Sequence, residues 1–128
     1  MPEQTAISTA GAPQNDNPYS QGVLADDLLF VSGFGPVDPE TGAEVEGGIR
    51  EHTHRAMENL AAVVREAGGS LDDVVKTTVY VADMDDYDAV NEAYADHVGE
   101  TPPARVCIEA ARLPEDVRVE IDAVAKVA

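Results

Sequence analysis

The sequence contains few aromatic side chains and only one cysteine. It has no tryptophan, two phenylalanines and four tyrosines in 128 residues, so a core must consist mostly of Val, Leu, Ile and Ala. Cys107 cannot form a disulfide within the chain. Residues 1–17 show neither the basic start nor the apolar stretch of a signal peptide. These features predict an intracellular, cytoplasmic protein.

Basic residues are also scarce. Eight Lys and Arg residues face 25 Asp and Glu residues, which gives a formal net charge of −17, and only Lys76 and Lys126 are lysines. Because phosphate groups are bound by clustered Lys and Arg, this charge argues against nucleic acid and anionic membrane as partners. No apolar run approaches the roughly 18 residues that span a bilayer. We expect the acidic residues to form a solvated surface that suits a high-salt cytosol.

Short β-rich runs and two amphipathic helices alternate along the chain. A polar, extended arm is expected at 1–18, with a brief strand at 5–9. The elements expected after the arm are strands at 19–25 and 28–32, a helix at 48–67, a strand at 74–81, a helix from 85 or 86 to 98, and strands at 103–109 and 117–122. The order β-β-α-β-α-β-β predicts one α+β domain over 1–128, with a mixed sheet covered on one face by two helices. The uncovered sheet face argues for an oligomer.

The stretch at 103–122 shows the clearest pattern, because apolar and polar residues alternate on both sides of Leu113-Pro114. It predicts a β-hairpin whose apolar side chains face the core. Arg105, Cys107 and Glu120 then share the opposite face, with Cys107 directly across from Glu120.

These side chains have two interpretations. They can form a cross-strand ladder of ion pairs around a small buried cysteine. Alternatively, Arg105 holds a planar carboxylate through two parallel hydrogen bonds, and a partly desolvated Glu120 moves a proton to or from water. Cys107 is expected to line such a pocket rather than act as a nucleophile, since no histidine lies near it in the pattern.

Other polar and aromatic residues carry weaker signals. We expect solvated positions, and no metal site, for the histidines at 52, 54 and 97, and packing roles for the tyrosines at 80, 87 and 94.

The residues of the hairpin resemble those of a known family. The run Pro103 to Leu113, closed by Val119-Glu120-Ile121, is similar to the signature of the RidA (YjgF) family of imine and enamine deaminases. Other runs agree with that family in order and spacing: residues 18–22, Ser32-Gly33 with Pro36, and residues 75–81 followed by Val90-Asn91.

This resemblance implies a chorismate-mutase-like α+β fold and a homotrimer, with the sheets packed into a central barrel and three sites in the clefts between subunits. The implied enzyme is of the 2-iminobutanoate/2-iminopropanoate deaminase type. It hydrolyses small 2-imino acids, the tautomers of enamines, to 2-keto acids and ammonia without metal or organic cofactor. Arg105 would bind the substrate carboxylate, and Glu120 would position and activate water.

The resemblance also implies further substrate-binding residues. The backbone around Cys107 and Gly33 would contact the imine end of the substrate. Tyr19 and Ser32 would form a pocket wall from a neighbouring subunit, and Asn91 would support the site.

Two residues depart from the family pattern. In the family, glutamine is usual at the position of Phe34, and an aromatic residue is usual at the position of Pro102, directly before Pro103. Both differences bear on the expected shape of the pocket. Two other functions stay open: a regulatory trimer that binds a small metabolite without turnover, and the ribonuclease or translation inhibitor also attached to this family. The net charge of −17 argues against the ribonuclease.

Overall fold

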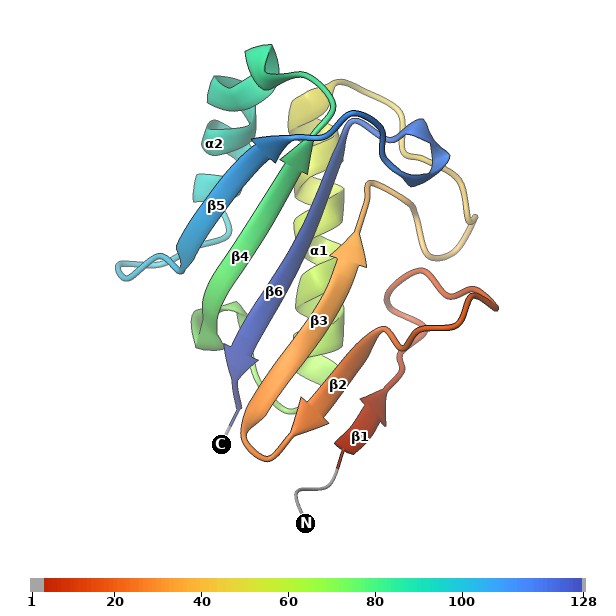
Figure 1. The fold of residues 1–128 in the computed structure, drawn as a ribbon, viewed down its shortest axis with the longest axis vertical. Coiled ribbons are helices and arrows are strands. Elements are labelled where there is room, and N and C mark those ends of the chain that lie inside the picture. Colours follow the sequence, from red (N-terminus) through yellow and green to blue (C-terminus); the bar gives the residue numbers. More distant parts are fainter. Residues whose placement is uncertain (1–3, 128) are drawn as a thin grey trace.

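The computed structural model describes residues 4–127 and places two helices behind one mixed sheet of six strands (Figure 1). The elements are β1 (Gln4–Ile7), β2 (Gly22–Ala25), β3 (Leu28–Phe34), α1 (Ile49–Glu66), β4 (Val74–Val81), α2 (Tyr87–Ala95), β5 (Ala104–Glu109) and β6 (Val119–Lys126), with single 3-10 turns at Leu71–Asp73, Met84–Asp86 and Pro114–Asp116. The strand order is β1-β2-β3-β6-β4-β5. The predicted layers are confirmed, and the brief strand of the arm joins the sheet as β1.

Helix α1 provides most of the layer behind the sheet. It begins after Gly48, whose backbone N–H donates to the Glu51 carboxylate at 2.7 Å. It ends before Gly68, where a φ of +96° suits glycine. Its apolar side chains, among them Leu60 and Val63, are fully buried against the strands. On the same helix Asn59 is buried and donates to the backbone carbonyls of residues 35 and 37, which fixes the loop that follows β3.

The central strand β6 separates the core from the other sheet face. Val119 and Ile121 are fully buried under the helices, whereas Glu120 and Asp122 alternate with them on the uncovered face. Strand β6 pairs in antiparallel fashion with β3 on one side and β4 on the other. The middle of the sheet therefore presents a carboxylate side chain, Glu120, to the face that no helix covers.

The predicted hairpin between β5 and β6 is wrong. Strand β4 lies between them, with β5 parallel to it and β6 antiparallel to it. The connecting segment passes over the end of β4, where the N–H of Ala110 donates to Val81 and the N–H of Ala82 donates to the carbonyl of Arg118. Leu113 and Val117 of this segment are buried, so it packs as a crossing loop rather than a tight turn.

The predicted orientation of β5 is also wrong. Val106 and Ile108 lie on the uncovered face, where they are 47% and 43% exposed. Arg105 and Cys107 are half-buried on the helix side, since Cys107 is the parallel partner of the core residue Val79. Strand β5 is at the sheet edge, and alternation along an edge strand does not determine which of its faces the helices cover.

The uncovered face carries exposed apolar side chains in two places, Leu28 and Phe30 of β3 and Val106 and Ile108 of β5, with β6 and β4 between them. In Figure 1 both helices lie behind the sheet and no element covers its front. Exposed apolar side chains on a sheet face that no described element covers favour an interaction surface. No helix within residues 4–127 has the length and apolar character needed to cross a membrane.

Candidate active site

The predicted site residues fall into two groups on opposite faces of the sheet. Arg105, on β5, faces helix α2, and Glu120, on β6, faces the uncovered side. Strand β4 separates the two strands. The chain alone therefore does not bring Arg105 and Glu120 onto one face, as the predicted hairpin register required.

Arg105 belongs to the group that we call the arginine half: Arg105, Cys107 and Asn91, with Tyr87 and Tyr94 of α2. The guanidinium carbon lies 5.0 Å from the ring centroid of Tyr94 and 5.6 Å from that of Tyr87. Arg105 also donates from Nη2 to the Tyr87 hydroxyl at 3.3 Å. Contacts between a guanidinium and aromatic faces are attractive and directional, so the two rings hold the charge in place. Both tyrosines were predicted to be packing residues only.

Arg105 has no carboxylate partner within residues 4–127. Five of the eight basic residues form ion pairs with Asp or Glu side chains. Asp122, a carboxylate of β6, accepts a hydrogen bond from the Tyr80 hydroxyl at 3.1 Å. In a chain with 25 acidic residues, an arginine fixed by tyrosines and left without a carboxylate is available to an external anion.

Cys107 and Asn91 complete the arginine half. Burial raises the pKa of the Cys107 thiol, and the nearby charge of Arg105 opposes that effect. A thiol with a raised pKa is protonated at neutral pH and is a poor nucleophile, as expected for a residue that lines a site. Asn91 lies on the same face of α2 as Tyr87 and Tyr94, and its Oδ1 is buried without a hydrogen-bond partner in the described chain.

The other group, which we call the glutamate half, consists of Tyr19, Ser32, Gly33 and Glu120. Tyr19, Gly33 and Glu120 line one pocket of about 180 Å³, together with Phe34 and the segment 114–117. A Cβ atom on Gly33 would lie 2.5 Å from Oε2 of Glu120. The carboxylate thus occupies the space that a side chain at position 33 would fill.

Glu120 is half-buried, and its surroundings favour the protonated form. Burial raises the pKa of its carboxyl group, and the negative charge of Asp122 on the same strand raises it further. A carboxyl group whose pKa moves toward neutrality can both accept and donate a proton at moderate pH. The glutamate half therefore has the chemistry of a general acid or base.

Ser32 and Tyr19 are fixed by the segment that precedes β2. The Ser32 hydroxyl donates to the carbonyl of Ser20 at 2.6 Å. The Tyr19 hydroxyl accepts a hydrogen bond from the side chain of Asn15 at 2.8 Å, while the tyrosine itself is 56% exposed. Tyr19 therefore projects into solvent at the mouth of the Glu120 pocket.

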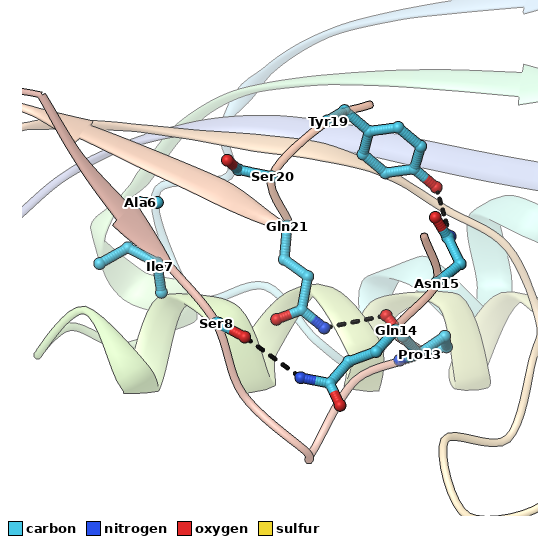
Figure 2. A pocket seen from close by; sticks show the side chains of 9 residues that line it. All are labelled: Ala6, Ile7, Ser8, Pro13, Gln14, Asn15, Tyr19, Ser20 and Gln21. Atoms are coloured by element: carbon cyan, nitrogen blue, oxygen red, sulfur yellow. Dashed lines mark hydrogen bonds between the residues drawn. The ribbon is translucent and has the colours of Figure 1, made fainter. Parts of the chain in front are cut away.

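Gln21 belongs to the run 18–22 that agrees with the family pattern, but no role for it follows from the sequence; in the structure it organises the N-terminal arm. Its buried amide donates to the carbonyls of Thr9, Ala12 and Pro13 and accepts from the N–H of Thr9. Gln21 lines a pocket of about 250 Å³ that the arm forms with Ser20 and Tyr19, and Figure 2 shows its side chain among the other residues of that pocket. The arm is thus tied to the start of β2 and positions Tyr19 between the two pockets.

The expectation of a solvated position is wrong for His52, whereas His54 and His97 are half-buried. His52 is 3% exposed, because the core side of α1 includes position 52. Nδ1 of His54 lies 2.8 Å from Nε2 of His97, which joins α1 to the end of α2. Burial, and then the neighbouring His54, lower the pKa of His97. Within residues 4–127, no group of three His, Cys, Asp or Glu side chains could hold a metal ion.

Known proteins are similar to this chain in both sequence and fold. The model of the Endoribonuclease L-PSP family matches residues 9–127. A RutC family protein of Pyrococcus abyssi is 49% identical over 93% of this chain and 94% of its own length. The 2-iminobutanoate/2-iminopropanoate deaminase of Homo sapiens is 43% identical over 93% of this chain and 87% of its own length. The crystal structure of E. coli TdcF with bound serine is similar with a TM-score of 0.90 and 38% identity, over 97% of this chain and 99% of that chain. The chain therefore belongs to the Endoribonuclease L-PSP family, the RidA (YjgF) group to which its motifs are similar.

Proposed function

We propose that the protein is a homotrimeric deaminase that hydrolyses reactive 2-imino acids to 2-keto acids and ammonia. In this proposal Arg105 of one subunit and Glu120 of a neighbour act in the same cleft. The observation that carries it is an Arg105 that two tyrosines hold and that has no carboxylate partner in the described chain, on the sheet face opposite to a Glu120 with a raised pKa. The named deaminase relatives supply the substrate class.

An assembly between subunits follows from the separation of the two halves. A substrate whose carboxylate binds Arg105 cannot reach Glu120 through β4 of the same chain. Burial of the exposed apolar side chains of the uncovered face, including Phe30 and Ile108, by another subunit would stabilise an assembly. A cyclic trimer built on this face gives three equivalent clefts, each with an arginine half from one subunit and a glutamate half from the next.

The chemistry needs only orientation and proton transfer. Arg105 binds the substrate carboxylate and fixes the imine carbon, which is already electrophilic. Water adds to the carbon of the protonated imine while the Glu120 carboxylate takes one proton from the water, which gives a neutral carbinolamine. The protonated Glu120 then donates that proton to the nitrogen, the C–N bond breaks and ammonia leaves, and the Glu120 carboxylate takes the hydroxyl proton as the carbonyl forms. The raised pKa of Glu120 serves both steps.

Gly33 has a defined part in this proposal. Because a side chain at position 33 would collide with the Glu120 carboxylate, glycine allows that carboxylate to lie against the backbone of β3. The carboxylate then stays at the mouth of the pocket that Tyr19 borders.

A second candidate is a regulatory trimer that binds a small amino or keto acid without turnover. The structure of E. coli TdcF holds serine, which is an amino acid and not an imine. Such a function keeps the carboxylate contact of Arg105 but has no need of the Glu120 proton.

An amino-acid oxidase that generates the imine, coupled to detection of the keto acid, tests the proposal. We expect wild type to accelerate keto acid release, and Glu120→Gln and Arg105→Ala to lose the acceleration. Wild type that binds 2-oxobutanoate without accelerating imine hydrolysis would favour the regulatory trimer. Light scattering of wild type and both variants checks that each remains a trimer.

A further inference from the structure

The two tyrosines that hold Arg105 use their hydroxyl groups differently. Tyr94 is 6% exposed, and its hydroxyl is hydrogen-bonded to Oγ1 of Thr77 at 2.7 Å inside the core. Tyr87 is 40% exposed, and in the described part of the chain the contact with Arg105 is the only hydrogen bond of its hydroxyl group. The Tyr94 hydroxyl is therefore used in a hydrogen bond of the core, whereas the Tyr87 hydroxyl lies at the surface beside the guanidinium of Arg105.

The direction of the bond between Arg105 and Tyr87 follows from their chemistry. A guanidinium carries only donors, so the Tyr87 oxygen accepts the hydrogen bond from Nη2 at 3.3 Å. The phenol proton is not used in that bond and stays available for an acceptor. A neutral donor thus lies next to the charged donors of Arg105 and points its proton away from them.

We propose that Tyr87 is a second binding residue for the substrate carboxylate, which its hydroxyl contacts while Arg105 holds the same group. This inference rests on the proposed function, because the ligand is the 2-imino or 2-keto acid of that site. A carboxylate has two oxygens and about four lone-pair positions, so it can accept from a guanidinium and a phenol together. The ring of Tyr87 packs beside the guanidinium, so the hydroxyl is positioned before the ligand arrives.

The arrangement selects a carboxylate, which in the proposed function belongs to a small 2-imino or 2-keto acid. A hydrogen bond between a neutral donor and a charged acceptor contributes more than one between neutral groups. Loss of the Tyr87 hydroxyl should therefore weaken carboxylate binding about tenfold. The proton transfer at Glu120 takes place on the neighbouring subunit in this account, so kcat should change little.

Tyr87→Phe and Tyr94→Phe form a matched pair, because each keeps its ring beside Arg105 and deletes one hydroxyl. We would measure the Kd of 2-oxobutanoate by calorimetry, the KM and kcat for the corresponding imine, and the Tm. Tyr87→Phe should raise Kd and KM about tenfold at nearly constant kcat and Tm. Tyr94→Phe should lower the Tm through loss of the Thr77 bond, and it should raise the Kd less than Tyr87→Phe does, because its ring stays beside Arg105.

Equal affinity of Tyr87→Phe and wild type for 2-oxobutanoate would overturn the proposal. An equal loss of affinity in both variants would also overturn it, because the hydroxyls would then act only by holding α2 and Arg105. The binding arm does not depend on turnover. If wild type binds the keto acid but does not hydrolyse the imine, the deaminase function fails, and the Kd values of the two variants still decide the role of Tyr87.

Discussion

Two tyrosine rings hold the charged group of the arginine half, whereas in the glutamate half the lack of a side chain at Gly33 leaves the space that the Glu120 carboxylate occupies. Tyr87 and Tyr94 pack beside the Arg105 guanidinium, which has no carboxylate partner within residues 4–127. Glu120 occupies the space over Gly33, and burial and a like charge raise its pKa. The comparison suggests a division of labour, in which the rigid, positively charged half binds and the crowded, acidic half moves protons.

Removal of the Glu120 carboxylate should have the largest effect and should separate the two halves. Glu120→Gln is expected to lower kcat about 100-fold or more, because it deletes the proton acceptor and keeps the shape. The Kd of 2-oxobutanoate, set mainly by the arginine half, should stay within about twofold of wild type. Steady-state kinetics and calorimetry on the same preparation measure both. A Glu120→Gln enzyme with near wild-type kcat would refute the division of labour.

Gly33→Ala should damage the glutamate half alone. The new Cβ would meet Oε2 of Glu120 at 2.5 Å, so the carboxylate must move. We expect kcat to fall about tenfold to a hundredfold, with the trimer intact. Gly35→Ala is the matched control, since its Cβ would meet only ordinary contacts with Val117 at 3.5 Å. Equal activity of the two variants would show that the position of the carboxylate over Gly33 is unimportant.

The pH profile should depend on Asp122. Burial and the Asp122 charge raise the pKa of Glu120, so the active carboxylate is lost as the pH falls through that raised value. Asp122→Asn removes the repulsion and should shift the acidic limb of kcat/KM to lower pH, by less than about one unit. The raised pKa also means that the charged Glu120 costs stability at neutral pH, so Glu120→Gln should melt at the same temperature as wild type or higher. An acidic limb that Asp122→Asn leaves unmoved would assign that limb to another group.

Salt should act on the whole surface more than on either half. With a net charge of −17, self-repulsion destabilises the folded chain, and molar KCl screens it. We predict that the Tm rises with KCl concentration, while the Kd of 2-oxobutanoate changes by only a few fold. Calorimetric measurement of the Tm at low and at molar KCl concentration tests this prediction. A constant Tm would remove the proposal that the acidic surface is adapted to high salt.

Local patterns predicted the elements well. The alternating, β-branched run at 74–81 coincides with β4, and the apolar spacing of 48–67 matches α1 to within one residue at each end. These features depend on side chains only a few positions apart, which a single sequence displays directly.

Strand order could not be predicted in the same way. The insertion of β4 between β5 and β6 is a pairing between distant segments, and neither flank of the turn region encodes it. The orientation of β5 failed for a related reason, because both its faces carry apolar or half-buried side chains, such as Ile108 and Cys107. As a result, the sequence identified Arg105 and Glu120 as candidates but placed them on one face of the sheet.

The role of the tyrosines was also beyond the sequence pattern. Tyr87 and Tyr94 lie seven residues apart on one helix face, which is typical of packing residues. Only the location of Arg105 beneath α2 shows that these rings contact a charge. The signal available in the sequence was a pair of aromatic residues at helical spacing, together with an arginine on a predicted strand.

Mixed trimers test the central claim, that each site takes Arg105 from one subunit and Glu120 from the next. Arg105→Ala and Glu120→Gln chains with different tags can be co-expressed, and trimers that carry both tags can be isolated. Each parent trimer should be inactive. Every mixed trimer should have one cleft with both residues intact and about one third of wild-type turnover. Mixed trimers as inactive as their parents would contradict a site shared between subunits.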